Sequence, residues 1–266
     1  MRTGSDATAV PRPMTEARLV DVGGHRLRVR DLGQGPRCYL CLHGLLDTLE
    51  VWSRLEPELA AHGRLVLVDQ RAHGESDAPP GPYRREELAA DVIGLLDALE
   101  IQRAVLVGHS MGGIVAMTTA LSAPERVEAL VLLGTASQCS ERVAGWYEEI
   151  AHAGETQGLP GLARKVFGSR SSREVRGDAA GIAHLTRTLR SLWDDPLTPE
   201  LRRIDCPVLL VVGEQDPMGP KASSLIADAL PDSTLRVLPG VGHWSHVESP
   251  DEVGEALRTF STRMKR

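Results

Sequence analysis

Residues 104–121 read AVLVGHSMGGIVAMTTAL and contain the pattern that indicates the fold most strongly. The apolar run Ala104–Val107 predicts a buried strand, and Ile114–Leu121 has the apolar spacing of a helix. Between them lies Gly-His-Ser-Met-Gly, residues 108–112. A serine that turns the chain sharply between strand and helix needs small neighbours, because bulky side chains would clash. The stretch therefore predicts a G-x-S-x-G nucleophile elbow that exposes Ser110 at the positive end of the following helix.

Short apolar runs alternate with helical patterns on both sides of this turn. The further predicted strands are Ala17–Val22, Arg26–Leu32, Cys38–Leu42, Leu65–Val68, Val127–Leu133, Pro207–Val212 and Thr234–Leu238. The further predicted helices are Leu49–Ala61, Glu86–Leu99, Lys221–Leu230 and Asp251–Met264. Continuous apolar strands between helices are typical of a parallel sheet covered on both faces. The sequence therefore predicts an α/β fold with a mostly parallel central sheet flanked by helices, opened by a hairpin through Gly23-Gly24.

This rhythm is interrupted after Gly134, the end of the sixth predicted strand. From Thr135 to Arg203 the sequence is helical and charged, with no convincing strand. A segment of this length predicts a helical cap inserted after the sixth strand. The expected organisation is a flexible N-terminal arm (1–16), a core in two parts (17–134 and 204–266) and a helical cap (135–203).

The overall charge and hydropathy exclude several classes of partner. The 266 residues have a net charge of −6 and a pI of about 5.9, which disfavours nucleic-acid binding. No window approaches 18 consecutive apolar residues, and residues 1–18 lack the apolar segment of a signal peptide. We therefore expect a cytoplasmic monomer or homodimer that binds neither nucleic acid nor membrane.

Cys38 and Cys41 form a C-x-x-C pattern inside a predicted strand. Positions i and i+3 of a strand face opposite sides, so the two thiols should not meet. We therefore predict buried thiols rather than a redox or metal site.

A serine hydroxyl is a poor nucleophile without a base, so a histidine and an acid should follow later strands. Asp216 follows the strand Pro207–Val212, and His243 follows the strand Thr234–Leu238. The order Ser110, Asp216, His243 is the chain order expected for this elbow, and the strand ends gather at one edge of the sheet. Glu214 and His246 are the competing acid and base.

The chain resembles an α/β-hydrolase-fold enzyme over nearly everything after Ala17. The stretches that carry the resemblance are Leu42-His43-Gly44, Asp69–Asp77, Gly108–Gly113, Gly213–Pro217 and Gly242–Pro250. The resemblance implies a Ser–His–Asp triad, no metal, no cofactor, and a cap after the sixth strand. It also implies an oxyanion hole made by the backbone N–H groups of Leu45 and Met111. Ala72 stands where the family often has glycine, which should restrict that turn slightly.

Within this family, a serine nucleophile disfavours the dehalogenases and epoxide hydrolases, which attack with a carboxylate. Residues 108–113 resemble small bacterial esterases and enol-lactonases, so we expect a serine hydrolase of a carboxylic ester or lactone. His243-Trp244 is similar to the carbon–carbon bond hydrolases of ring-cleavage products, although those usually have asparagine where His109 stands. Lyases, oxygenases and receptors on the same fold remain alternatives, because fold alone does not decide function.

Aromatic and basic residues suggest how the substrate is bound. Only 4 Trp, 3 Tyr and 2 Phe are present. Five of them lie in the expected cap or beside His243: Trp146, Tyr147, Phe167, Trp193 and Trp244. We predict substrate contacts from Trp146, Trp193 and Trp244, and a partly apolar substrate. His43 is placed at the same site, where ordering the oxyanion loop is its main expected role.

The expected cap is rich in basic residues, with acids interspersed. The basic side chains are Arg164, Lys165, Arg170, Arg173, Arg176, Arg187 and Arg190. A solvated helical surface is the simpler interpretation, and a clamp for a substrate carboxylate is the alternative.

Overall fold

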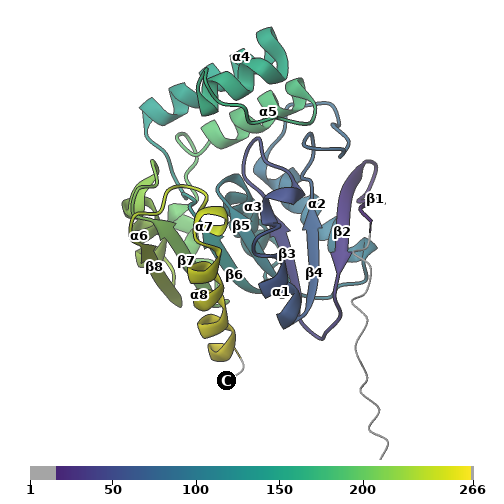
Figure 1. Cartoon of the computed structure of the whole chain (residues 1–266), viewed down its shortest axis with the longest axis vertical. Helices are drawn as coiled ribbons and strands as arrows, with labels where there is room; N and C mark the ends of the chain where they lie inside the picture. Colours follow the sequence, from purple (N-terminus) through teal and green to yellow (C-terminus); the bar gives the residue numbers. More distant parts are fainter. Residues whose placement is uncertain (1–15, 265–266) are drawn as a thin grey trace, which may run out of the picture.

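A computed structural model describes residues 16–264 and contains one eight-stranded sheet (Figure 1). The strand order is β1-β2-β4-β3-β5-β6-β7-β8. The strands are β1 Arg18–Asp21, β2 Arg26–Leu32, β3 Cys38–Leu42, β4 Arg64–Val68, β5 Ala104–His109, β6 Val127–Leu133, β7 Val208–Gly213 and β8 Ser233–Leu238. β2 pairs antiparallel with β1 and β4, and every other pairing is parallel. The predicted hairpin and mostly parallel sheet are confirmed.

Helices cover both faces of this sheet. They are α1 Glu56–His62, α2 Arg85–Ala98, α3 Met111–Ser122, α6 Gly219–Ala229, α7 Ser245–Glu248 and α8 Pro250–Arg263. Buried side chains of α2, α3 and α6 share one apolar core with one face of the sheet, and those of α1 and α8 share another with the opposite face. Cys38 lies in the first core and Cys41 in the second, both as free buried thiols, as their strand spacing predicts. Burial raises the pKa of both thiols, which leaves them unreactive.

The helix predicted over Leu49–Ala61 is two separate elements. A 3₁₀ turn, η1 Leu49–Trp52, precedes α1, which begins at Glu56. Pro57 occupies the first turn of α1, where a missing N–H is tolerated, but within a continuous helix it would remove an internal hydrogen bond. The prediction of one continuous helix was therefore wrong.

Residues 135–203, called here the cap segment, contain α4 Glu141–Phe167, α5 Ala179–Arg190 and the 3₁₀ turn η3 Thr198–Arg203. α4 is broken at Gly158, whose φ of 63° only glycine adopts readily. Figure 1 shows α4 and α5 stacked over the edge of the sheet where β5, β6 and β7 end. The division into cap and core remains a prediction, and nearly all of the predicted arm, 1–15, lies outside the described residues. No helix in residues 16–264 is long and apolar enough to cross a membrane.

Candidate active site

Ser110 lies on a strained turn at the centre of the sheet edge. It follows β5 directly and precedes α3, with φ 50° and ψ −113°. Ser110 N donates to Leu133 O at 2.9 Å, and the Thr135 hydroxyl donates to Ser110 O at 2.7 Å. These contacts with the end of β6 stabilise a conformation that costs a non-glycine residue on the order of 1–3 kcal/mol.

The two glycines of the predicted elbow allow the close contacts that the turn requires. A Cβ on Gly112 would lie 2.0 Å from Leu42 O, and one on Gly108 would lie 2.4 Å from Gly112 O. The start of α3 therefore packs directly against the end of β3 and against β5, the strand that leads into α3. This contact is the physical reason for glycine at both positions of the pattern.

Asp216 and His243 leave adjacent strands and meet at the same edge. His243 Nδ1 lies 2.9 Å from Asp216 Oδ2, and the Asp216 side chain is fully buried. Asp216 Oδ1 also accepts a hydrogen bond from Met218 N at 2.8 Å, which fixes the carboxylate. A carboxylate can only accept here, so Nδ1 carries the proton and Nε2 presents a lone pair.

His243 reaches the Ser110 turn through its neighbour His109. The two imidazole rings lie 4.7 Å apart, and His109 Nε2 is 3.1 Å from His243 O. Among the described residues, no hydrogen bond joins Ser110 Oγ to His243 Nε2. Catalytic hydrogen bonds are often long in enzymes without substrate and tighten when it binds.

Two competing residues have other partners. Glu214 Oε2 accepts from Gly240 N at 3.0 Å, so this acid stabilises the turn before His243. His246 is fully buried with its ring 4.6 Å from that of Trp52, and neither of its nitrogens has a hydrogen-bond partner among residues 16–264. Burial lowers the pKa of His246 to about 3, so this ring stays neutral. The geometry therefore pairs Asp216 with His243 rather than with His246.

Glu248 supports the loop of His243, and no local sequence pattern points to this acid. Its carboxylate accepts from Gly242 N at 2.8 Å and from Trp244 N at 3.0 Å, the backbone groups on either side of His243. Glu248 ends the short helix α7, so one turn of helix holds the loop of His243 in place. The sequence offers only an acid five residues after His243, and this spacing has no specific meaning unless the conformation of the loop is known.

Leu45 and Met111, the predicted oxyanion donors, lie on segments that touch. Leu45 follows β3 and Met111 is the first residue of α3, and these two elements are in backbone contact through Gly112. The first N–H groups of a helix have no intrahelical partner. Within residues 16–264, neither Leu45 N nor Met111 N donates a hydrogen bond to another backbone group. Neither N–H group is therefore taken by a backbone acceptor, and their role as oxyanion donors remains a prediction.

His43 lies beneath the loop that contains Leu45 rather than on the surface of that loop. It is fully buried, its Nδ1 is 2.8 Å from Gly44 O, and its Nε2 accepts from Gln70 N at 3.0 Å. Burial lowers the pKa of His43 to about 4, so the ring is neutral. No ring nitrogen is left for a substrate. The loop-ordering role fits this position, and the predicted direct contact of His43 with substrate does not.

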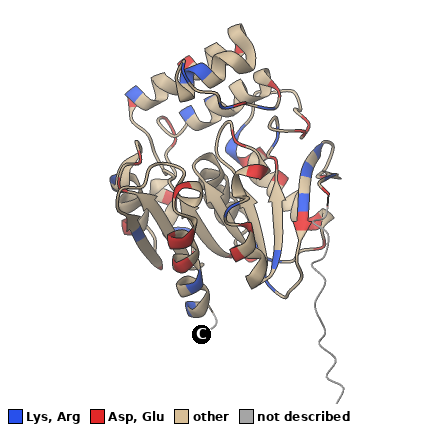
Figure 2. Cartoon of the chain, viewed as in Figure 1, with Lys and Arg blue, Asp and Glu red and all other residues tan. Residues whose placement is uncertain are grey.

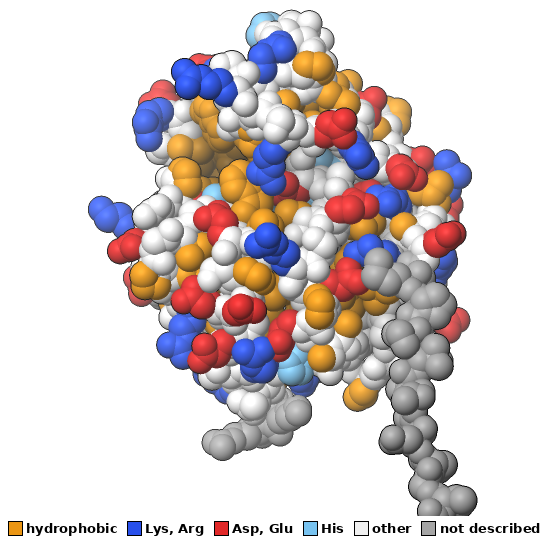
Figure 3. Space-filling view, viewed as in Figure 1, with side chains coloured by type: hydrophobic (Ala, Val, Ile, Leu, Met, Phe, Trp, Pro, Cys, Tyr) orange, Lys and Arg blue, Asp and Glu red, His pale blue; other side chains and the backbone are white. Residues whose placement is uncertain are grey.

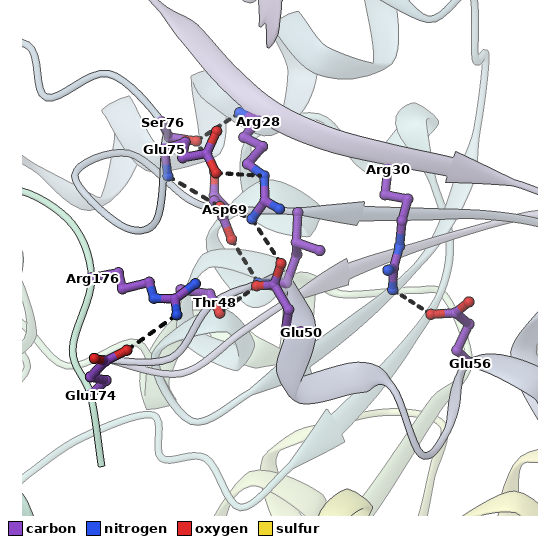
Figure 4. A network of polar contacts seen from close by, with 11 residues as sticks. Arg28, Arg30, Thr48, Glu50, Glu56, Asp69, Glu75, Ser76, Glu174 and Arg176 are labelled. Carbon is purple, nitrogen blue, oxygen red and sulfur yellow. Dashed lines mark hydrogen bonds and ion pairs between the residues drawn. The ribbon is translucent and has the colours of Figure 1, made fainter. Parts of the chain in front are cut away.

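Residues 69–77 support the same loop from the other side. His73 Nε2 accepts from Leu46 N at 3.1 Å, and Asp69 Oδ1 accepts from Leu49 N at 2.6 Å. Figure 4 shows Asp69 between Arg28 and the turn that contains Thr48 and Glu50. These contacts fix residues 43–48, the loop that contains the predicted donor Leu45 and is called here the oxyanion loop, to β2 and to the end of β4.

Trp244 anchors an aromatic cluster beside His243. The Trp244 ring lies 5.0 Å from His243 and 6.0 Å from Phe167 of the cap segment. The Arg173 guanidinium stacks on both aromatic rings, 4.3 Å from Trp244 and 4.6 Å from Phe167. Figure 3 shows a hollow between the cap segment and the sheet, with hydrophobic side chains on its walls. The cap segment therefore contacts the loop of His243 at this cluster.

The other two predicted tryptophans are more exposed. Trp146 is 39% exposed and contacts Tyr147, and Trp193 is 46% exposed. Their contact with a substrate remains a prediction.

Most basic residues of the cap segment have acidic partners, and Figure 2 shows both charges on its helices. Arg187 binds Glu148 and Glu155, and Arg190 binds Asp194. Arg173 differs because it extends to Asp47, beyond the end of β3, where Nη2 and Oδ1 are 3.2 Å apart.

Comparison with known proteins agrees with this architecture. The sequence model of a family described as alpha/beta hydrolase fold matches residues 40–250. The 3-oxoadipate enol-lactonase 2 of Acinetobacter baylyi is 30% identical over 255 residues, covering 89% of this chain and 93% of that protein. The 2-hydroxymuconate semialdehyde hydrolase of a Pseudomonas species is 29% identical, covering 87% and 88%.

A crystal structure of the enol-lactonase from Burkholderia xenovorans superimposes with a TM-score of 0.84 at 27% identity. It covers 92% of this chain and all of that one. With the family model matching most of its length, the chain belongs to the alpha/beta hydrolase fold family.

Proposed function

We propose that this protein is a serine hydrolase that cleaves a carboxylic ester or lactone of a small, partly apolar molecule. The observation that supports this most is the meeting of Asp216 and His243 at 2.9 Å, beside a serine on a strained turn. Ser110 is the proposed nucleophile, His243 the base and Asp216 the acid that orients it. Two similar proteins are named as enol-lactonases, which act on a cyclic ester.

The proposed reaction has two steps. Ser110 Oγ attacks the acyl carbonyl while His243 Nε2 takes its proton, and Asp216 stabilises the imidazolium. The N–H groups of Leu45 and Met111 stabilise the oxyanion, each by about 2.7–4 kcal/mol. His243 then protonates the leaving oxygen. Water, activated by the same base, releases the acid from the acyl-enzyme.

Arg173 supports the alternative that the substrate carries a carboxylate. Its side chain is 40% exposed beside Trp244, and the contact with Asp47 uses one of its five N–H donors. The oxoadipate in the name of a similar protein is an acid anion. We propose that Arg173 favours anionic substrates over their neutral esters.

A carbon–carbon bond hydrolase is the second candidate. The observation that favours it is the Trp244 ring placed 5.0 Å from His243, together with a similar protein named as a semialdehyde hydrolase. His109 stands against it, because the carbon–carbon bond hydrolases usually have asparagine at the position before the serine.

A substrate panel separates these candidates from a lyase, oxygenase or receptor. Purified protein is offered p-nitrophenyl esters of increasing acyl length, five- and six-membered lactones with and without a carboxylate, and a vinylogous diketone. Ser110→Ala is the matched control. Turnover of esters or lactones that Ser110→Ala loses supports the proposal. Exclusive turnover of the diketone supports the second candidate, and turnover of none contradicts both.

A further inference from the structure

Asp47 is a buried acid at the junction of three segments of the proposed site. Its side chain is 5% exposed, and Asp47 N donates to Gly44 O at 3.2 Å, which makes it part of the turn that holds Leu45. Its Oδ1 is 3.2 Å from Arg173 Nη2, and its Oδ2 accepts from Trp244 Nε1 at 2.9 Å. Asp47 therefore joins three segments: its backbone belongs to the oxyanion loop, and its carboxylate contacts the cap segment and the loop of His243.

His109 faces the same carboxylate without binding it. Its Nε2 lies 3.1 Å from His243 O, and a carbonyl can only accept, so Nε2 carries the proton in the neutral ring. Burial and the neighbouring histidines lower the pKa of His109, so this neutral form persists. The unprotonated Nδ1 is 3.7 Å from Asp47 Oδ2, beyond hydrogen-bond range. His109 therefore does not stabilise the Asp47 charge.

The carboxylate is unfavourable in this place, although it has partners. Burial raises the pKa of Asp47 to about 6, even though Trp244, Arg173 and His243 act in the opposite direction. A buried charge that lowers stability needs another reason to be present, and functional sites are where such groups gather. At neutral pH the ionised form depends on the contacts with Arg173 and Trp244.

The position of the Arg173 side chain is fixed only by its neighbours in this cluster. It belongs to residues 168–178, called here the cap linker, between α4 and α5. Its guanidinium packs over the rings of Phe167 and Trp244, and Asp47 is its only acidic partner among the described residues. Without the Asp47 charge, the stacking contacts alone would hold it, and cation–π contacts at exposed sites contribute about 0.5–1 kcal/mol.

We propose that Asp47 is a positioning residue that fixes Arg173 and Trp244 beside His243 and thereby couples the cap linker to the oxyanion loop. The proposal deepens the proposed function and rests on it, because Trp244 lies beside His243, the proposed base, and Arg173 packs on Trp244. Asp47 touches no reacting atom and acts through these two side chains.

The coupling depends on pH. As the pH falls through about 6, Asp47 gains a proton and its ion pair with Arg173 is lost. The groups that face Asp47 are Arg173, Trp244, His109 and His243. Of these, His109 remains neutral and an arginine stays charged, and the variant His243→Gln separates any contribution of His243 from that of Asp47.

The structural half of the proposal is tested without turnover. The full chain is labelled with 5-fluorotryptophan, and the fluorine resonance of Trp244 is identified by its absence from Trp244→Phe. We expect this resonance to shift with a midpoint near pH 6 in the parent chain and in His243→Gln, but not in Asp47→Asn. Arg187→Gln, which removes a separate cap ion pair, is the control and keeps the shift. A shift that survives in Asp47→Asn, or is lost only in His243→Gln, overturns the coupling.

The functional half is tested by separating KM from kcat at about pH 7.5 on a substrate found with the panel. Asp47→Asn and Arg173→Gln should each raise KM about tenfold while kcat changes less than about threefold, because neither residue acts on the reacting bond. The double variant should be no worse than the worse single variant, since both remove one contact. Fully additive effects, or a loss confined to kcat, contradict the proposal. Absence of turnover in the parent chain would contradict the proposed function alone, because the fluorine measurement still decides the coupling.

Discussion

Asp216 Oδ2 and His243 Nδ1 lie 2.9 Å apart at the ends of neighbouring strands β7 and β8. The Asp216 side chain is fully buried and the His243 side chain is 16% exposed, so the acid is shielded from water while the histidine stays partly accessible. A carboxylate buried in this way can orient the histidine without exchanging protons with water.

Asp216→Asn should lower kcat by about 10⁴-fold with little change in fold. An amide can donate to Nδ1, which favours the tautomer with the proton on Nε2, where it cannot accept from Ser110. Steady-state kinetics on an ester or lactone measures the effect. Glu214→Gln is the control and should keep most of the activity, because Glu214 bonds Gly240 N instead. Equal losses in the two variants would refute the assignment of Asp216.

Glu248→Gln should lower kcat about tenfold while the free energy of unfolding changes by less than about 1 kcal/mol. The carboxylate accepts from Gly242 N and Trp244 N, whereas an amide offers one oxygen and would present its NH₂ to the second donor. Kinetics and urea unfolding are measured together. Glu252→Gln, on the neighbouring helix α8, is the control. Unchanged kcat in Glu248→Gln would show that the loop of His243 needs no such clamp.

The difference in free energy of unfolding between Asp47→Asn and the parent chain should shift in favour of the variant as the pH rises from acid to neutral. The folded pKa of Asp47, about 6, lies above its ordinary value of 3.8, so folding favours the protonated form. Its contribution to stability is therefore complete below pH 3.8 and is lost as the pH rises through about 6. Asparagine does not titrate, so the unfolding free energy of the variant relative to the parent should rise by on the order of 2 kcal/mol between pH 4 and pH 8.

The measurement for this prediction is chemical denaturation of both chains across that pH range. Asp97→Asn is the control, because Asp97 is 63% exposed and surface ion pairs contribute little. A difference that stays flat with pH, or falls as pH rises, would show that the Asp47 charge is not destabilising.

Ala72→Gly should stabilise the fold or leave it unchanged, with a gain of at most about 1 kcal/mol. Ala72 has φ 65°, the left-handed region in which a Cβ is unfavourable. Its methyl is also buried against Gly181, so part of the gain is lost with that contact. Thermal unfolding measures the difference. Ala116→Gly in α3 is the comparison and should destabilise, so a similar loss in Ala72→Gly would contradict the strain.

The central part of the site could be predicted because backbone geometry dictates it locally. The elbow around Ser110 needs glycine at positions 108 and 112, and the structure shows Gly112 against Leu42 O. Asp216 and His243 follow strands, and parallel strands deliver their ends to one edge. The opposite facing of Cys38 and Cys41 follows from strand periodicity in the same way.

The supporting residues could not be predicted because their partners are distant in sequence. Asp47 and Trp244 are 197 positions apart, and no local pattern relates them. Glu248 acts on backbone N–H groups, which every residue has, so its role depends on the loop conformation alone. The sequence allows two roles for His43 because a pattern does not show burial, and full burial favours only loop ordering.

The proposed acyl-enzyme mechanism is tested most directly by measuring the mass of the protein during turnover. A good ester substrate is mixed with the enzyme, the reaction is quenched in acid within the first turnover, and the intact chain and its peptides are weighed. An acyl-enzyme mechanism predicts one acyl group per chain, located on the peptide that contains Ser110 and absent from Ser110→Ala. Turnover at full rate with no acyl adduct, or an adduct on another residue, would contradict it.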